Sequence, residues 1–447
     1  MSTQCKPLPA DAYRDKILPE RERAAVRNRW LMERLENYVP QLMEREGFDM
    51  WIIAAREYNE DPVIMSLLPE PMMAARRRTI LVFAKGADGT VERLTISRYG
   101  LGEFYRAVWD PEQEEQWDCL ARIVRERDPQ VIGINVSETH AFGDGLTHGE
   151  YLGMAAALGE TYMARTKGAE RLCVGYLEHR TQAEIAAYPG IVEIAHAIVA
   201  EAFSSKVILP GVTTTDDVVW WMRQKVTDLG LRTWFQPSVS IQAPDLAPAP
   251  MGGQPRKREP GGDSGVSPKP AAERKLIQPG DLLHCDFGII YLGLYTDTQE
   301  DAYVLRLGET DAPQGLHAAM AAGNRLQDIH LEMMVTGRTG NEILSLALAK
   351  AKAEGLRPTI YTHPLGYHGH AAGPTIGLWD QQGGVPGRGD YELFEHTGHS
   401  IELNVKYDVP EWGGQEVRMA LEQDIIYVGQ GKSVWLDGRQ TRLHLIG

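Results

Sequence analysis

The segment HCDFGIIYLGLYTD, residues 284–297, constrains the fold most, because it places two acids inside apolar runs. The two runs and the YLG sequence between them predict a β-hairpin with a tight turn. With the turn centred on Tyr291 and Leu292, Asp286 and Asp297 face each other, with Cβ atoms about 4.5–5.5 Å apart. A turn shifted by one residue would weaken this arrangement. Two such carboxylates repel each other, so the hairpin predicts a divalent metal, a neutralised pair or a pair that faces solvent.

Further carboxylates and imidazoles follow in contexts that are typical of buried strands. Glu402 lies in the run GHSIELNV and Glu422 in RMALEQDIIYV, while THPLGYHGHAAGPTIG contains His363, His368 and His370. One such acid is usually a capped or salt-bridged structural residue, but four of them with a histidine favour a metal site. Oxygen ligands with one imidazole suit Mn, Fe, Co or Zn, and paired metals that share carboxylates are typical of hydrolases.

Charge and cysteine content limit the partners and surroundings of the chain. The 447 residues carry a formal net charge of −15, which argues against DNA, RNA or an anionic membrane surface as the main partner. The four cysteines have no CxxC spacing, so we expect a reducing compartment rather than a zinc–thiolate site or a disulfide framework. We expect neither a secretory signal nor a membrane-spanning segment. These observations predict a cytoplasmic protein, and they leave a small substrate open because a local site can oppose the global charge.

The order of the remaining patterns predicts two domains. Residues 20–46 have the pattern of an amphipathic helix that Pro40 interrupts or ends. Short apolar strands alternating with a helix follow, which is typical of an α/β domain ending near residue 170. Thr181 and Glu184 then fit a capping box that begins a helix of a second, α+β domain.

The segment at about 243–274 is rich in Pro, Gly and charged residues and lacks an apolar period. Such a composition cannot form a packed core, so we expect a disordered surface insertion. A mobile lid or a dimer arm is the alternative, because loops of this length within a domain are usually either disordered or functional.

The order Asp, Asp, His, Glu, Glu resembles the pita-bread metallopeptidases, which include methionine aminopeptidase, aminopeptidase P and prolidase, with metal-free creatinase as a relative. The hairpin DFGIIYLGLYTD matches the D-x-G…D spacing of the family. SIEL at Glu402 and LEQD at Glu422 match its two acidic strands, and the sequence His370-Ala-Ala-Gly matches its H-x-x-G step. The N-terminal region resembles the creatinase-like domain of aminopeptidase P and prolidase. The resemblance therefore implies a creatinase-like α/β domain over residues 1–170 and an α+β pita-bread catalytic domain over 171–447.

The same resemblance implies a set of metal ligands. Asp286 would bind one metal, Asp297 and Glu422 would bridge two metals, and His370 with Glu402 would hold the second. The cofactors would be two divalent ions, with Mn as the first choice and Zn, Co or Fe as alternatives. A hydroxide between them would attack the scissile carbonyl.

Three residues are the candidates for catalysis. Glu402 would carry a proton toward the leaving amine, since general acid–base catalysis needs a group within hydrogen-bond reach. His368 is the second candidate for the metal-binding imidazole. His363 is a candidate for contact with the substrate, and a structural role in a turn is its alternative.

Some positions depart from the family pattern. No histidine occurs in residues 234–283, where the family usually has one before the first metal acid. The family also has a second histidine about seven residues after the metal histidine, and the corresponding position here is Gly377. Gln299 stands where the family often has arginine. The resemblance still implies a homodimeric Xaa-Pro aminopeptidase or dipeptidase that acts on a small peptide. Cleavage of a C–N or related bond in a small non-peptide metabolite is the alternative, and a non-enzymatic binding scaffold is the third.

Overall fold

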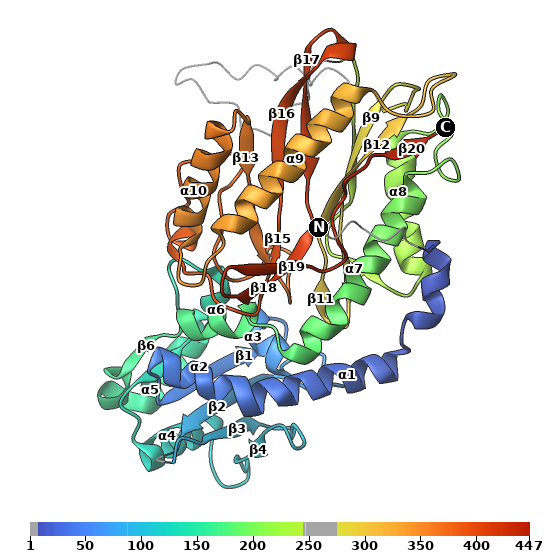
Figure 1. Cartoon of the computed structure of the whole chain (residues 1–447). Coiled ribbons are helices and arrows are strands. Elements are labelled where there is room, and N and C mark those ends of the chain that lie inside the picture. The colour runs from blue at the N-terminus through green and yellow to red at the C-terminus, as the bar shows by residue number, and fades with distance from the viewer. Residues whose placement is uncertain (1–7, 87, 245, 247–274) are drawn as a thin grey trace, which may run out of the picture. The chain divides into compact units, whose positions relative to one another are not determined.

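The computed structural model describes residues 8–86, 88–244, 246 and 275–447, and these form two compact units (Figure 1). The N-terminal unit comprises residues 18–186 and the short segment 366–373. The C-terminal unit comprises the residues up to 17, 187–365 and 374–447. Apart from residues 243, 244 and 246, the expected insertion at 243–274 lies outside the described residues.

The bounds of these units differ from the division that we expected at residue 170. The change from one unit to the other falls between residues 186 and 187, within helix α7 (Gln182–Ala202). Helix α6 (Glu170–Glu178) belongs to the N-terminal unit because it packs against α2 (Val39–Glu46) and α3 (Pro62–Leu67) of that unit. The two domain assignments themselves stay a prediction.

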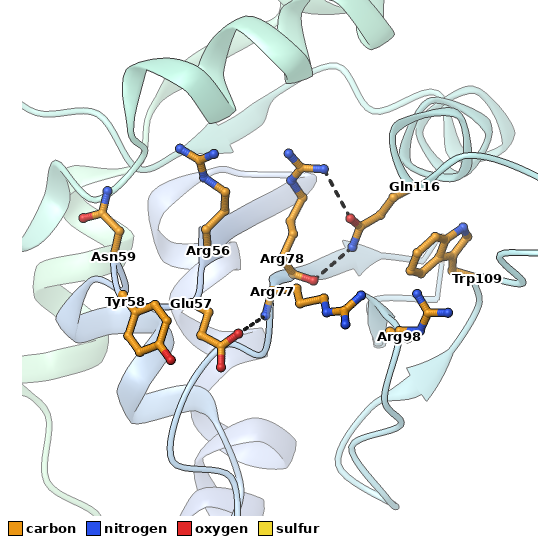
Figure 2. A pocket seen from close by; sticks show the side chains of 9 residues that line it. All are labelled: Arg56, Glu57, Tyr58, Asn59, Arg77, Arg78, Arg98, Trp109 and Gln116. Atoms are coloured by element: carbon orange, nitrogen blue, oxygen red, sulfur yellow. Dashed lines mark hydrogen bonds between the residues drawn. The ribbon is translucent and has the colours of Figure 1, made fainter.

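A six-stranded mixed sheet forms the centre of the N-terminal unit, in the order β4-β3-β2-β1-β5-β6. Strand β1 pairs antiparallel with β2 and parallel with β5. Its residues alternate between the two faces. Ile52 packs with α4 (Gln116–Arg127) and α5 (His148–Met163) on one face, whereas Trp51 contacts Tyr176 of α6 on the other. Arg56 and Arg78 pair directly at one end of β1 and β2, beside the pocket in Figure 2. The strands are β1 Met50–Arg56, β2 Arg78–Lys85, β3 Val91–Ser97, β4 Arg106–Ala107, β5 Ile132–Ile134 and β6 Thr166–Gly168.

The segment expected as an interrupted helix at residues 20–46 is helical throughout. Its break is a π-helical stretch, η2 (Arg34–Tyr38), and Pro40 lies in the first turn of the following α2, where proline is tolerated. The guanidinium of Arg34 is buried and binds Glu184, with Nη2 2.7 Å from Oε2. Glu184 also forms the expected capping box with Thr181. The other helices of this unit are α1 Glu20–Glu33, α2 Val39–Glu46, α3 Pro62–Leu67, α4 Gln116–Arg127, η3 Ala141–Gly143 and α5 His148–Met163.

The described residues of the C-terminal unit form four small sheets, with strand orders β11-β10-β7, β20-β12-β9-β8, β13-β16-β17 and β14-β15-β18-β19. Helix α9 packs on β16 and β17, and α10 packs on α9 and β13. Residues such as Leu316, Leu344, Leu403 and Met419 share this core. The helices are η1 Ala10–Lys16, α8 Thr215–Asp228, α9 Gln314–Met333, α10 Gly340–Ala353, η4 Arg388–Asp390 and η5 Pro410–Trp412. The strands are β7 Arg232–Thr233, β8 Ser238–Gln242, β9 Leu282–Phe287, β10 Ile289–Tyr291, β11 Leu294–Tyr295, β12 Thr298–Val304, β13 Pro358–Ile360, β14 His363–Leu365, β15 Thr397–Ser400, β16 Leu403–Val409, β17 Gln415–Leu421, β18 Asp424–Gly429, β19 Lys432–Trp435 and β20 His444–Ile446.

The predicted hairpin is present, but its turn lies one residue later than we expected. Leu292 and Gly293 occupy the turn, with φ of 55° and 82°, and positive φ at both central residues is typical of a type I′ turn. Asp286 therefore pairs with Gln299 across β9 and β12. The prediction that Asp286 faces Asp297 directly is therefore wrong, because the residue opposite Asp286 lies two positions later than Asp297.

Helix α7 is the one helix of the described residues whose length and mean hydropathy of 1.3 would suit a membrane span. Of its apolar window, 56% is buried inside the protein. The cytoplasmic location stays a prediction.

Candidate metal centre

The candidate ligands of the C-terminal unit lie where strands begin or end. Asp286 lies on β9 and Asp297 directly precedes β12, while His363 is the first residue of β14. Glu402 lies between β15 and β16, and Glu422 between β17 and β18. At Glu402 and at Glu422 the chain crosses from one sheet to another, because β15 and β18 belong to one sheet and β16 and β17 to a second. The ends of several strands thus bring together residues that are far apart in the sequence.

Carboxylates and one imidazole form a single cluster there. Asp286, Asp297 and Glu422 each offer an oxygen, and these three atoms lie within 4.8 Å of one another. His363, Glu402 and Glu422 meet the same distance limit. Since Glu422 belongs to both groups, the five side chains converge on one place.

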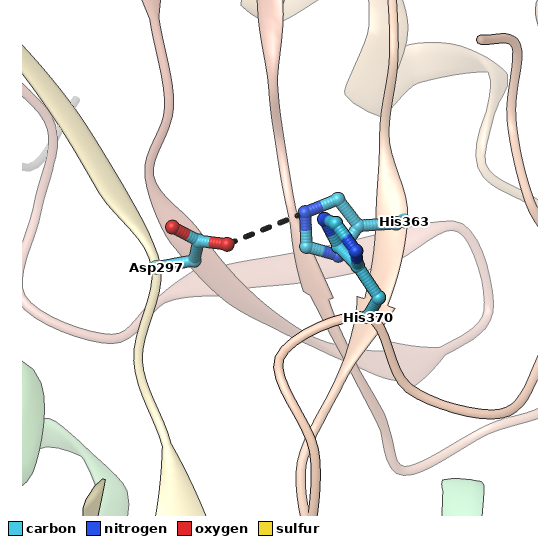
Figure 3. Close-up of side chains that lie close together, drawn as sticks. All are labelled: Asp297, His363 and His370. Carbon is cyan, nitrogen blue, oxygen red and sulfur yellow. Dashed lines mark ion pairs between the residues drawn. The ribbon is translucent and has the colours of Figure 1, made fainter. Parts of the chain in front are cut away.

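His363 is the imidazole of this cluster within the C-terminal unit. Its Nε2 atom lies 3.2 Å from Oε1 of Glu422 and 3.5 Å from Oδ2 of Asp297, and Figure 3 shows the latter pair. Its Nδ1 atom lies 3.0 Å from the carbonyl oxygen of Pro364. When Nδ1 donates to this carbonyl, Nε2 presents its lone pair to the acids, which is the tautomer that a metal ligand needs.

Removal from water changes the acid–base behaviour of the cluster. Burial, and then the charge of Glu422, raise the pKa of Asp286 to about 7. The same two causes raise the pKa of Asp297 and of Glu402 well above the ordinary range. Burial opposes the charge of His363, but Asp297 and Glu422 raise its pKa well above the ordinary value. The cluster therefore cannot hold all its negative charges unless protons or a cation balance them.

Two oxygens of the cluster fit a divalent cation. The Oδ1 atoms of Asp286 and Asp297 are buried and have no hydrogen-bond partner among the described residues. Buried polar atoms are usually paired, so such an exception needs an explanation. A divalent metal accounts for both atoms, because it binds carboxylate oxygens and offsets their repulsion.

Neighbouring side chains fix the orientation of the two glutamates. The Nε2 amide of Gln299 donates to Glu402 at 2.9 Å and to Glu422 at 2.7 Å, and Ser400 Oγ donates to Glu422 at 2.8 Å. The backbone N–H of Gln299 also donates to the Glu422 carbonyl at 3.0 Å, which ties β12 to the glutamate. Gln299 therefore holds Glu402 and Glu422 in place, as residues behind metal ligands commonly do.

A cavity of about 50 Å³ adjoins Glu402 and Gln299. Its lining includes Tyr361, Trp379 and Arg418, so it combines aromatic surface with one cation. Burial lowers the pKa of Arg418, although Asp301 and Glu402 oppose this effect. The space beside Glu402 can therefore take a small apolar group or an anionic one.

A sequence model of metallopeptidase family M24 matches residues 190–426, which is more than half of the chain. The chain belongs to metallopeptidase family M24. None of the curated proteins matches it at the sequence level. Members of this family use divalent metals, in agreement with the acidic cluster described above.

Solved structures share the fold of this M24 metallopeptidase over nearly its whole length. An X-Pro aminopeptidase from Thermotoga maritima MSB8 matches with a TM-score of 0.60 and 16% identity, covering 90% of this chain and 99% of that one. A Xaa-Pro dipeptidase from Bacillus anthracis matches with a TM-score of 0.58 and 18% identity, covering 93% and 99%. The N-terminal domain of the FACT complex subunit SPT16 from Cicer arietinum matches with a TM-score of 0.53 and 10% identity, covering 94% and 99%. At these identities the likeness shows the fold alone, and it confirms the predicted pita-bread fold with an N-terminal domain.

Two histidines that we predicted for the site of this M24 metallopeptidase lie in the segment 366–373, which belongs to the N-terminal unit. His368 packs against Phe142 there, with ring centroids 4.9 Å apart, and burial lowers its pKa to about 4. His370 is exposed. The roles of His368 and His370 stay predictions.

The sequence also contains a signal for His363 that the prediction did not use. His363-Pro364-Leu365-Gly366 fits the H-x-x-G step of M24 metallopeptidases as well as the His370 sequence does. With His363 as the reference, His370 follows seven residues later, at the spacing of the second family histidine. The apparent loss of that histidine at Gly377 then disappears.

Proposed function

We propose that this M24 metallopeptidase is an Xaa-Pro-type exopeptidase, an aminopeptidase or a dipeptidase. The observation that carries the proposal is the convergence of Asp286, Asp297, Glu402, Glu422 and His363, with two buried carboxylate oxygens that have no hydrogen-bond partner among the described residues. The likeness to solved structures described as an X-Pro aminopeptidase and a Xaa-Pro dipeptidase supports this choice of substrate.

The proposed ligands of two divalent ions are the four carboxylates and His363, with His363 in place of the His370 that we first expected. We keep Mn as the first choice, with Zn, Co or Fe as alternatives, because oxygen ligands with one imidazole suit these metals. Bound divalent ions would activate a water molecule and polarise the substrate carbonyl.

The residues of the chain itself supply proton transfer and positioning. The raised pKa of Glu402 favours a carboxyl that can hold a proton, which suits transfer to the leaving amine. Gln299 would keep this carboxyl in position. His370 is proposed to face the substrate, since it follows His363 at the family spacing.

A panel of Xaa-Pro dipeptides and of tripeptides with proline in the second position tests the proposal. Metal-loaded protein should release proline from the dipeptides if it is a dipeptidase, and the N-terminal residue from the tripeptides if it is an aminopeptidase. Metal-loaded protein that cleaves no member of the panel would rule out the Xaa-Pro assignment.

A second candidate function is the cleavage of a C–N or related bond in a small non-peptide metabolite by the same site. The observation in its favour is Gln299, which stands where the family often has arginine and whose amide binds both Glu402 and Glu422. Turnover of a metabolite extract by metal-loaded protein, with peptides left intact, would favour this candidate. The homodimer also stays a proposal, and light scattering of the purified protein would test it.

A further inference from the structure

The N-terminal unit contains an arginine-lined pocket of about 550 Å³ (Figure 2). Four guanidinium groups line it, from Arg56, Arg77, Arg78 and Arg98, together with the ring of Trp109. A volume of this size is typical of small-molecule sites. All the residues that line the pocket belong to the N-terminal unit, and it shares no residue with the metal cluster.

The sheet register forces two of these arginines together. Arg56 and Arg78 are directly opposite each other in the β1–β2 ladder, where like charges destabilise a sheet. The buried Glu150 compensates for both, with Arg56 Nε 3.1 Å from Oε1 and Arg78 Nε 2.5 Å from Oε2. One carboxylate thus serves two guanidinium groups, and the pair keeps an excess of positive charge.

The other two arginines carry no compensating ion pair. The side chains of Arg77 and Arg98 are exposed and form no salt bridge with any described residue. Glu57, which also lines the pocket, uses its carboxylate to accept the backbone N–H of Arg77 at 3.1 Å. Four guanidinium groups therefore lie beside the two carboxylates of Glu57 and Glu150. Although the whole chain has a net charge of −15, this local excess of positive charge attracts anions.

The loops at the pocket hold unusual backbone conformations. Tyr58, Arg76 and Arg77 have φ of 71°, 40° and 63°, and they are three of the seven non-glycine residues with positive φ in the described part of the chain. Bulky residues rarely adopt this region, and strain of this kind tends to gather at functional sites. The backbone N–H of Glu57 donates to the carbonyl of Arg77 at 2.7 Å and joins the two loops. The conformation that presents Arg77 is therefore fixed by the fold.

We propose that this pocket binds a small organic anion with at least two negative charges on phosphate or carboxylate groups, and with a planar body that packs on Trp109. Guanidinium groups bind both kinds of oxyanion through paired N–H donors. Trp109 is half-buried, and its Nε1 donates to the Glu114 carbonyl at 2.9 Å, so its ring is held in place for stacking.

Titration calorimetry of the full-length protein at fixed ionic strength tests the proposal. The probes are inorganic phosphate, pyrophosphate, citrate and AMP. At least one of the last three should bind with a Kd below about 1 mM. Pyrophosphate and citrate distinguish phosphate from carboxylate recognition, and comparison of AMP with inorganic phosphate tests the planar body.

The double variant Arg77→Gln/Arg98→Gln removes two charges without breaking an ion pair of the described structure, so it should fold normally. Its affinity for the bound probe should fall at least about tenfold. The matched control is Arg21→Gln/Arg29→Gln on α1, which removes the same charge from exposed arginines outside the pocket and should change affinity less than about twofold. Absence of binding by pyrophosphate, citrate and AMP, or an equal loss in the control, would overturn the site. AMP binding no tighter than inorganic phosphate would overturn the role of Trp109.

Discussion

The Nε2 atom of His363 lies 3.2 Å from Oε1 of Glu422, although the two residues are 59 positions apart in the sequence. His363 begins β14 and Glu422 follows β17, so two different sheets contribute the pair. Because the same glutamate is also within reach of Asp286 and Asp297, this contact joins the imidazole to the acidic cluster.

Replacing His363 should remove metal, whereas replacing His370 should not. His363→Ala deletes the imidazole that faces Glu422 and Asp297, and we expect metal affinity to fall more than about 100-fold, since even supporting residues behind ligands cost about 10–100-fold. His370→Ala should keep its metal and lose activity. Metal content and proline release of the two variants, measured together, check this. Loss of metal in His370→Ala with retention in His363→Ala would reverse the assignment.

Gln299 should act by positioning the two glutamates. Gln299→Ala removes the donors to Glu402 and Glu422, and we expect metal affinity or activity to fall about 10–100-fold. Chelator competition and kcat/KM of the variant measure the two quantities. The control is Gln130→Ala, a change at an exposed glutamine of the N-terminal unit. A variant indistinguishable from wild type in both measurements would contradict this role.

Metal should stabilise the protein more at higher pH. The pKa of Asp286 is raised from 3.8 to about 7 in the metal-free fold. The contribution of Asp286 to the stability of the metal-free fold is fully present below pH 3.8 and is lost as pH rises through 7. A metal competes with the proton and replaces it, so the rise in Tm on addition of Mn²⁺ should grow from pH 5 to pH 8. A rise in Tm that is largest at pH 5 would be inconsistent with a proton that the metal displaces.

The buried Arg34–Glu184 pair should govern the acid stability of the N-terminal unit. Burial alone would raise the pKa of Glu184, but Arg34 and then Arg180 lower it from 4.5 to about 2. The stability from this group is present above pH 4.5 and is lost as pH falls toward 2. Glu184→Gln leaves Arg34 buried without its counter-charge and should cost about 3–5 kcal/mol.

Urea unfolding at pH 7 measures the cost for Glu184→Gln. Glu160→Gln, at an exposed position of α5, is the control and should change the free energy of unfolding by less than about 0.5 kcal/mol. If Glu184→Gln destabilises no more than this control, the pair is not a determinant of stability.

Asp286 and Asp297 share one face of the hairpin even though its register differs from the expected one. Moving a two-residue turn by one position changes each cross-strand pair by two residues, so both acids keep their face of the sheet. Asp286 and Asp297 are therefore diagonal rather than opposite neighbours, and they still offer oxygens within 4.8 Å of each other. The sequence did not reveal the observed turn, because that turn requires a positive φ at Leu292, and residues other than glycine rarely adopt one.

Features that depend on the packing of distant segments could not be predicted in this way. His363 and His370 both begin an H-x-x-G sequence, and only the strand pairing of β14 brings the first of them to Glu422. The arginine-lined pocket depends on the β1–β2 register that sets Arg56 opposite Arg78. Neither arginine stands in a pattern that would distinguish it from a solvated surface residue.

Metal content of the purified protein, measured by mass spectrometry beside Asp297→Asn, tests the central claim most directly. Asp297 contributes a buried oxygen without a hydrogen-bond partner among the described residues, and it is a proposed metal ligand. We predict that wild-type protein holds a divalent transition metal after reconstitution and that Asp297→Asn loses both metal and activity. Wild-type protein that holds no metal after reconstitution, or an Asp297→Asn variant that keeps its full metal content, would contradict the account.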